Sequence, residues 1–177
     1  AMHILMGNHE EMLLGALEKI EVMRHFVQHG GRETILSFGL DEKTYAAASW
    51  EELLEMTNRV IAPEWIDFIR TFEASVCIGD YAFVHAGIRP GVALEAQSLS
   101  DLRWIREPFL SSELAHGHVI VHGHTITDEP VFRRNRIGID TGAYMSGRLT
   151  ALRLEGEEKS LISTSIEDGK ISISLER

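Results

Sequence analysis

Cysteine is almost absent from this sequence: Cys77 is the one cysteine in 177 residues. A single thiol excludes a disulfide within the chain, and its place in the apolar run 74–78 predicts a buried, inert side chain. The sequence also lacks a signal peptide and any apolar run near the roughly 20 residues that a membrane span needs. We therefore expect a cytoplasmic protein with no membrane partner.

Basic residues are outnumbered: 17 Lys and Arg stand against 27 Asp and Glu, which gives a net charge of −10. This excess of negative charge argues against binding a nucleic-acid duplex, whose phosphates need basic surfaces. The remaining composition, with 44% hydrophobic and 25% charged residues, is typical of a globular protein. A length of 177 residues predicts a single domain with a substantial core.

Polar residues follow a short apolar run close to the start of the sequence. Residues 3–6 lead into Gly-Asn-His-Glu at 7–10 and then into an amphipathic segment, a pattern that predicts a strand, a turn and a helix. Ligands of open α/β sheets bind at the carboxyl ends of strands, where Asn8 could offer an oxygen to a metal and His9 could transfer a proton. The alternative is structural, with Asn8 and Glu11 as a capping box and His9 as an ordinary first-turn residue.

Two later apolar runs also end in histidine beside glycine. Residues 81–84 precede His85, and residues 119–121 precede His122-Gly123-His124. A lone histidine in such a place is more often a core or loop residue than a ligand. Three strand ends that each carry Asn or His favour a shared ligand site at one edge of a sheet.

These motifs together resemble the second half of the calcineurin-like metallophosphoesterase signature. They are Gly-Asn-His-Glu at 7–10, His-Ala-Gly at 85–87 and Gly-His-Thr at 123–125. The segments 101–107 and 135–144 are similar to those of bacterial Ser/Thr phosphoprotein phosphatases and the related symmetrical diadenosine tetraphosphatases, so the resemblance covers roughly residues 3–154. It implies an α/β fold, a metallophosphoesterase-type β-sandwich of two mixed sheets flanked by helices.

The resemblance implies a dinuclear metal-dependent phosphatase and gives roles to individual residues. Asn8, His85 and His124 would hold the second metal ion. Two imidazoles with oxygen donors suit Mn, Fe or Zn better than Mg or Ca, and Mn is our first expectation. His9 would donate the proton to the leaving group, and Glu10 would orient one of these side chains.

Three further residues take roles by the same resemblance. Arg106 would contact the phosphate, because a planar guanidinium makes two parallel bonds to it, whereas Arg103 fits a surface ion pair. His122 would be a neighbour of the metal ligands rather than a ligand. Tyr144 would lie near the bound phosphate at the end of the loop 140–144; the alternative is that Asp140 and its neighbours only satisfy the backbone of a turn.

The sequence departs from the family in one respect: it contains neither Gly-Asp-x-His-Gly nor Gly-Asp-x-x-Asp-Arg-Gly. By the resemblance, these motifs supply the first metal site, so only the second is encoded here. We expect an N-terminally truncated domain with little or no activity. The alternative is an inactive folded fragment that acts as a binding module, and it could form homo-oligomers through the strand edge that truncation leaves exposed. A phosphorylated protein, a small phosphoester and diadenosine tetraphosphate all remain candidate substrates.

Helical patterns occupy the first half of the sequence. Apolar residues recur at helical spacing over 10–29, which predicts one long helix with Gly30-Gly31 as its stop. A helical insertion is expected at about 40–72, with Ser49 as a helix cap and Pro63 in a first turn.

The second half is predicted to be mainly β structure. A short helix is expected at 99–105, and strands are expected at 75–78, 81–84, 119–121, 130–133, 136–140, 148–155, 159–166 and 170–175. Asp168-Gly169 is a hairpin turn in this prediction, and the alternation of Ile171, Ile173 and Leu175 predicts a sheet with one wet face.

Overall fold

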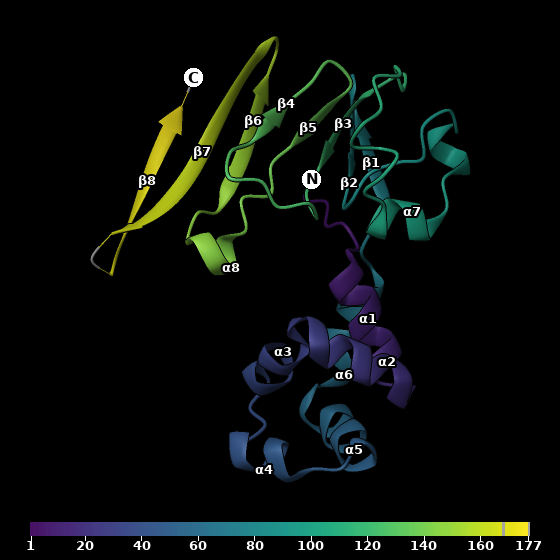
Figure 1. Cartoon of the computed structure of the whole chain (residues 1–177), viewed down its shortest axis with the longest axis vertical. Coiled ribbons are helices and arrows are strands. Elements are labelled where there is room, and N and C mark those ends of the chain that lie inside the picture. The colour runs from purple at the N-terminus through teal and green to yellow at the C-terminus, as the bar shows by residue number, and fades with distance from the viewer. Residues whose placement is uncertain (168, 177) are drawn as a thin grey trace. The chain divides into compact units, whose positions relative to one another are not determined.

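The computed structural model describes residues 1–167 and 169–176. The chain divides into two compact units, Ala1–Glu73 and Ala74–Arg177 (Figure 1). The first is built mainly from helices, and the second from strands joined by loops and short helices. Helices together with a mixed and an antiparallel sheet confirm the expected α/β class.

The helical unit begins with a hairpin of two helices. Its elements are α1 (Asn8–Ala16), α2 (Ile20–Phe26), the π-helical turn η1 (Val27–Gly31), α3 (Arg32–Ser37), α4 (Glu42–Ala47), α5 (Trp50–Val60) and α6 (Pro63–Arg70). The prediction of one helix over 10–29 is wrong, because Lys19 is extended (φ −136°, ψ 127°) and α1 and α2 pack against each other. Gly15 permits this approach: a Cβ there would lie 3.0 Å from Cγ1 of Val22. Two short helices folded back on each other have the same apolar spacing as one long helix.

The segment before α1 is less regular than a strand. Leu5 forms a single parallel bridge with Glu73, and Met6 N–H donates to the Glu73 carbonyl at 2.8 Å. The helix then begins at Asn8 with Gly7 as its N-cap, and the Gly7 N–H donates to the Glu10 carboxylate at 2.9 Å. The predicted strand is therefore one bridge long, and the capping pair lies one residue earlier than Asn8 and Glu11.

The helices predicted over about residues 40–72 are present as α4, α5 and α6. Ser49 caps α5: its Oγ accepts from Glu52 N–H at 3.2 Å, and the Glu52 carboxylate accepts from Ser49 N–H at 2.8 Å. This reciprocal pair satisfies two donors that a helix start leaves free. Pro63 occupies the first turn of α6, where its missing N–H has no cost.

A five-stranded sheet organises the second unit. Its strands are β1 (Ser75–Ile78), β2 (Tyr81–Val84), β3 (Val119–His122), β4 (Val131–Phe132) and β5 (Arg136–Gly138), in the order β1-β2-β3-β5-β4. β2, β3 and β5 are parallel, whereas β1 and β4 are antiparallel to their neighbours. The carboxyl ends of three adjacent strands therefore lie at the same edge of the sheet.

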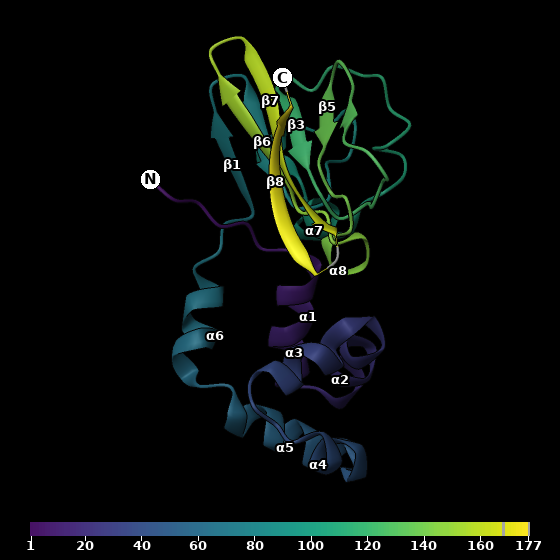
Figure 2. The same cartoon turned by 90° about the vertical axis from the view of Figure 1, so that its left-hand side faces the viewer.

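A second sheet of three antiparallel strands follows: β6 (Thr150–Glu155), β7 (Glu158–Glu167) and β8 (Lys170–Glu176). Figure 2 shows β7 and β8 as a long, curved pair of strands. The five-stranded sheet is mixed, as expected, but the three-stranded sheet is antiparallel, so the expectation of a second mixed sheet is wrong. Asp168 of the predicted hairpin turn lies outside the described residues.

The apolar face of β8 is open to solvent. Ile171, Ile173 and Leu175 are 71%, 74% and 55% exposed, and Ile166 of β7, the cross-strand partner of Ile171, is also exposed. The predicted alternation is present, but the described residues do not cover the face that it marks. Alternation shows which side chains share a face and does not show what packs on that face.

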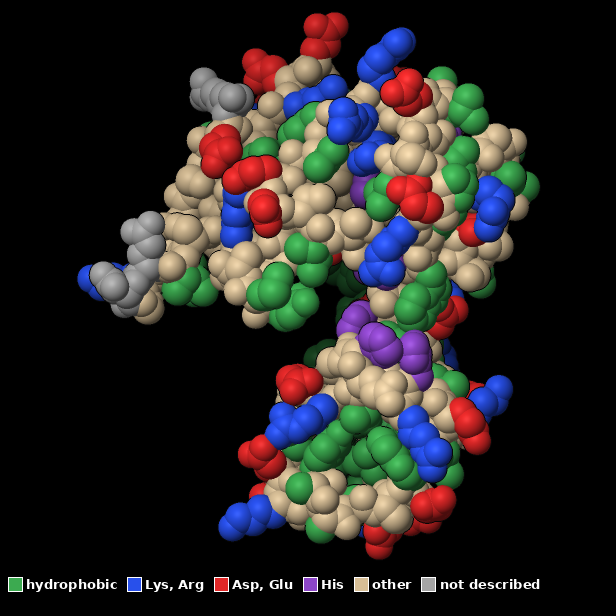
Figure 3. Space-filling view, in the orientation of Figure 1, with side chains coloured by type: hydrophobic (Ala, Val, Ile, Leu, Met, Phe, Trp, Pro, Cys, Tyr) green, Lys and Arg blue, Asp and Glu red, His purple; other side chains and the backbone are tan. Residues whose placement is uncertain are grey.

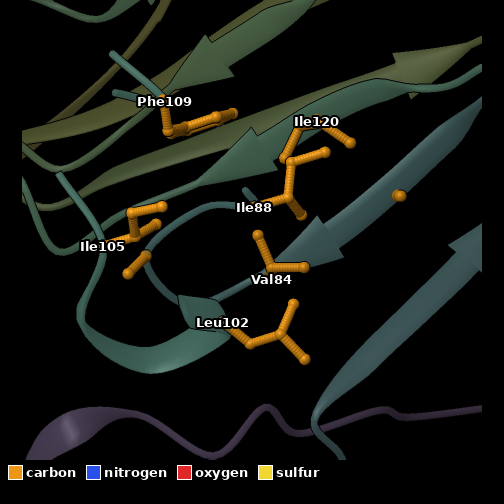
Figure 4. Close-up of a cluster of buried hydrophobic side chains, with 8 residues drawn as sticks. Val84, Ile88, Leu102, Ile105, Phe109 and Ile120 are labelled. Carbon is orange, nitrogen blue, oxygen red and sulfur yellow. The ribbon is translucent and has the colours of Figure 1, made fainter. Parts of the chain in front are cut away.

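The core of the second unit lies between the five-stranded sheet and the chain that follows β2. Figure 4 shows Val84 of β2 and Ile120 of β3 beside Ile88, Leu102, Ile105 and Phe109. Leu102 comes from α7 (Leu99–Trp104), which confirms the helix predicted at 99–105; the turn η2 (Leu94–Ala96) precedes it, and α8 (Ala143–Ser146) follows β5.

The prediction of a buried thiol is wrong. Cys77 is exposed, whereas Val76 beside it is buried. β1 is an edge strand whose side chains alternate between two faces, so its neighbours in sequence cannot both face the core.

Candidate metal site at the strand ends

The carboxyl ends of β2, β3 and β5 bring polar residues to one edge of the sheet. His85 follows β2, His122 ends β3, and Asp140 lies two residues beyond β5. Backbone hydrogen bonds continue past the strands and hold these ends together: Gly123 N–H donates to the His85 carbonyl at 2.9 Å, and Ile139 N–H donates to the His122 carbonyl at 3.0 Å. Two of the three strand ends expected to converge, those that carry His85 and His124, are therefore adjacent within this unit.

His85 and His124 are neighbours at this edge. Their ring centroids are 5.2 Å apart, and Trp104 lies 6.2 Å from the His124 ring. His124 has a backbone φ of 62°, a left-handed conformation that residues other than glycine seldom adopt. The three-residue turn around it is closed by Thr125 N–H donating to the Gly123 carbonyl at 2.7 Å. Such strain is characteristic of functional positions.

The electrostatic surroundings keep the His124 imidazole neutral. Its pKa is lowered to about 4, mainly by burial and to a smaller degree by the neighbouring His85 and Arg106, whereas a backbone hydrogen bond with Trp104 and the Asp140 carboxylate act in the opposite direction. Its Nε2 is buried and has no hydrogen-bond partner among the described residues. A neutral imidazole with a free nitrogen is the form that binds a divalent metal.

Asp140 contributes a carboxylate that sequence reasoning left as a turn-forming residue. One of its oxygens accepts from Gly142 N–H at 3.0 Å, and the other is 3.8 Å from where a Cβ on Gly123 would lie. The His85 carbonyl lies 3.7 Å from the same point, so the glycine sits between the strand ends. An Asp immediately after an apolar run was the available signal, and it is the same signal that drew attention to His85.

His122 has a different environment. It is buried against Phe109, with ring centroids 5.0 Å apart at an interplanar angle of 77°. Its Nδ1 donates to the Gly123 carbonyl at 3.1 Å, while its Nε2 is buried without a partner among the described residues. Burial lowers its pKa to about 4. Gly138 is what gives this ring room, because a Cβ there would lie 3.2 Å from Nε2.

The two residues expected to contact phosphate are exposed. Arg106 lies just beyond α7 and is close enough to His124 to affect its pKa. Tyr144 in α8 is 86% exposed. The Asp101 carboxylate accepts from Arg89 at 2.7 and 3.0 Å.

The remaining predicted site residues belong to the helical unit. Asn8 is buried at the start of α1, His9 is exposed, and Glu10 accepts the Gly7 N–H. Figure 3 shows a group of histidine side chains on the surface of this unit. His25 and His29 have ring centroids 4.3 Å apart.

The side chains at the strand ends provide some of the ligands that a metal ion needs. Two imidazoles, one with an unpartnered buried nitrogen, and a nearby carboxylate match the preferences of Mn, Fe or Zn. Over residues 1–167 and 169–176, no three His, Cys, Asp or Glu side chains are grouped closely enough to bind an ion by themselves. Further donors would therefore be needed to complete the coordination.

A mixed sheet with paired histidines at its strand ends defines a candidate metal centre. The similar proteins found by comparison carry the same name. The chain is 28% identical over 151 residues to the bis(5'-nucleosyl)-tetraphosphatase PrpE [asymmetrical] of Anoxybacillus flavithermus, covering 76% of this chain and 60% of that protein. It is 47% identical over 47 residues to the proteins of the same name from Bacillus thuringiensis and Bacillus cereus, covering 19% of each. The chain thus spans less than two thirds of these relatives. No family model matches it.

In the described part of the chain, none of the helices has the length and apolar character to cross a lipid bilayer.

Proposed function

We propose that this chain acts in the metal-dependent hydrolysis of phosphoric esters or anhydrides. The observation that carries the proposal is the pair His85 and His124 at adjacent strand ends, with a buried, unpartnered Nε2 on His124. The similarity to proteins named bis(5'-nucleosyl)-tetraphosphatase supports the same reaction class. A cytoplasmic location and a homo-oligomeric state are part of the proposal.

The proposed ligands are His85 and His124, together with Asn8 from the sequence motif and with Asp140 as a further oxygen donor. Mn is the first candidate, and Fe and Zn are alternatives. Such a metal, when bound, polarises a phosphoryl oxygen and lowers the pKa of water. Burial, the largest cause, and the nearby Arg106 lower the pKa of His124 and so favour its neutral imidazole.

The other proposed roles concern the substrate. Arg106 is exposed near His124 and would bind the phosphate through its planar guanidinium, with Tyr144 as a second contact. His9 would protonate the leaving oxygen, and a general acid of this kind is typically worth about 10²–10⁴-fold in rate. Glu10 holds the Gly7 N–H at the start of α1 and so fixes the backbone beside His9. His122 packs against the Phe109 ring next to the strand ends and would support the ligands without binding the metal.

The relatives' name makes a dinucleoside tetraphosphate the first substrate to test, ahead of phosphoproteins and small monoesters. Mn²⁺ should bind the chain in a calorimetric titration and should produce slow hydrolysis of diadenosine tetraphosphate that stops on addition of EDTA. Chromatography of the products distinguishes cleavage into a triphosphate and a monophosphate from cleavage into two diphosphates. The absence of both Mn²⁺ binding and metal-dependent turnover would contradict the proposal.

A binding module is the second candidate, and one observation favours it. Five apolar side chains are exposed on β7 and β8: Ile162, Ile166, Ile171, Ile173 and Leu175. An exposed apolar sheet face with an open edge strand favours association with a further chain. We expect light scattering to find a dimer or larger assembly, and Ile173→Lys should shift it toward the monomer. A monomer at all concentrations would count against this candidate.

A further inference from the structure

Three arginines lie within four residues at the turn between β4 and β5. They are Arg133, Arg134 and Arg136, in a chain with 17 basic residues and a net charge of −10. Together with Asn135 and the segment 110–113 they line a cavity of about 470 Å³, here called the β4–β5 pocket. Pockets of a few hundred Å³ are of the size that holds a small molecule.

The pocket is separate from the strand ends that carry the histidines. Arg136 is the first residue of β5, and Asp140 follows the last residue of that strand. Four residues of extended chain span roughly 13 Å at about 3.3 Å per residue. The two sites therefore lie at opposite ends of β5, and a ligand in one does not use the residues of the other.

Arg136 is the feature that points to an anion. Its side chain is 7% exposed, and its Nη2 donates to the Leu110 carbonyl at 2.7 Å. Its Nε is buried and has no acceptor among the described residues. Burial and Arg133 lower its pKa, while Glu107 raises it. A buried cation with so few acceptors is costly, and an anion beside it would reduce that cost.

The other two arginines are exposed and available. No carboxylate among the described side chains, those of residues 1–166 and 169–176, forms a hydrogen bond or ion pair with the side chain of Arg133 or Arg134. The acidic residue in the pocket wall is Glu113, so three positive charges meet one negative charge. Nearby Ser111 donates its hydroxyl to Glu107 at 2.6 Å.

The wall of the pocket is held in place by Asn135. Its side-chain Nδ2 donates to the backbone carbonyls of Ser112 at 2.8 Å and Leu114 at 2.9 Å. The backbone carbonyl of Asn135 accepts from Ile120 N–H at 3.0 Å. These bonds join the turn between β4 and β5 to the segment after Phe109 and to β3. The arginines therefore sit on a preformed scaffold, which lowers the entropic cost of binding.

We propose that the β4–β5 pocket binds the phosphate group of a small phosphorylated molecule. Arginine is suited to this ligand because its planar fork makes parallel, charge-assisted bonds to phosphate oxygens. The proposal does not depend on the hydrolytic function, since it involves neither the histidines nor a metal ion.

The test is a calorimetric titration of the whole chain with inorganic phosphate and with pyrophosphate, in the presence of EDTA so that no metal contributes. We expect binding that weakens at least about tenfold for each of Arg133→Gln and Arg134→Gln, because one lost hydrogen bond to a charged group corresponds to about that factor. Both side chains are exposed, so these variants should fold. Arg153→Gln, an exposed arginine of β6, is the matched control and should bind like the unchanged chain.

Three results would overturn the proposal: no binding of either probe at millimolar concentration, equal binding by the Arg133→Gln/Arg134→Gln double variant, or an equal loss in the Arg153→Gln control. Mn²⁺ titrations of the same double variant separate the two sites. A loss of phosphate binding with unchanged Mn²⁺ binding supports the pocket whether or not the chain hydrolyses phosphoesters.

Discussion

Replacing Phe109 with alanine is expected to lower the free energy of unfolding by about 3–5 kcal/mol, the usual cost of truncating a buried phenylalanine. Phe109 is completely buried and contacts both the core and the candidate site. Its ring packs edge to face on His122. The Arg136 guanidinium lies over the same ring, with its Cζ 5.9 Å from the ring centroid. It also fills the space beside Gly87, where a Cβ would lie 2.3 Å from the ring. Alanine would leave a cavity bordered by several fixed groups.

Urea denaturation followed by circular dichroism measures this change. The matched control is Phe132→Ala in β4, because Phe132 is 46% exposed and its truncation should change stability by less than about 1 kcal/mol. A loss below about 1 kcal/mol for Phe109→Ala would show that the core around β2 and β3 rearranges to fill the cavity, contrary to the packing in Figure 4.

Replacing His124 or His85 with alanine is expected to weaken Mn²⁺ binding by more than about 100-fold. Changing a residue that only supports a ligand already costs about 10–100-fold, so removing an imidazole ligand should cost more. The two rings are 5.2 Å apart, and the unpartnered Nε2 of His124 has no structural role among the described residues. Calorimetric titration with Mn²⁺ measures the effect.

The controls address folding and specificity. His118→Ala changes a partly buried histidine just before β3, away from the carboxyl ends, and should leave Mn²⁺ affinity unchanged. His124→Asn keeps a residue that tolerates a φ of 62°, so it separates loss of the imidazole from strain in the turn. Unchanged Mn²⁺ affinity in both His85→Ala and His124→Ala would exclude this pair as metal ligands.

Local elements could be predicted where their signals are local. The hairpin of β1 and β2 around Gly79-Asp80 and the cap at Ser49 depend on residues within a few positions of each other. The helix break at Lys19 could not be predicted, because helical spacing is unchanged when a helix folds back on itself. The exposure of Cys77 depends on β1 being an edge strand, which its own composition does not show.

The candidate site also has features that the sequence shows and features that depend on the tertiary structure. The sequence by itself determined that His85 follows an apolar strand directly and that His124 lies two residues beyond another, since apolar runs ending in polar residues can be recognised in the sequence. Only the tertiary structure decided that β2, β3 and β5 are adjacent and parallel, that the Asp140 carboxylate lies beside Gly123, and that Arg136 is buried at the opposite end of β5. The physical reason is that strand order and burial depend on contacts between residues far apart in the sequence, which hydrogen bonds across the sheet and packing of the core select together.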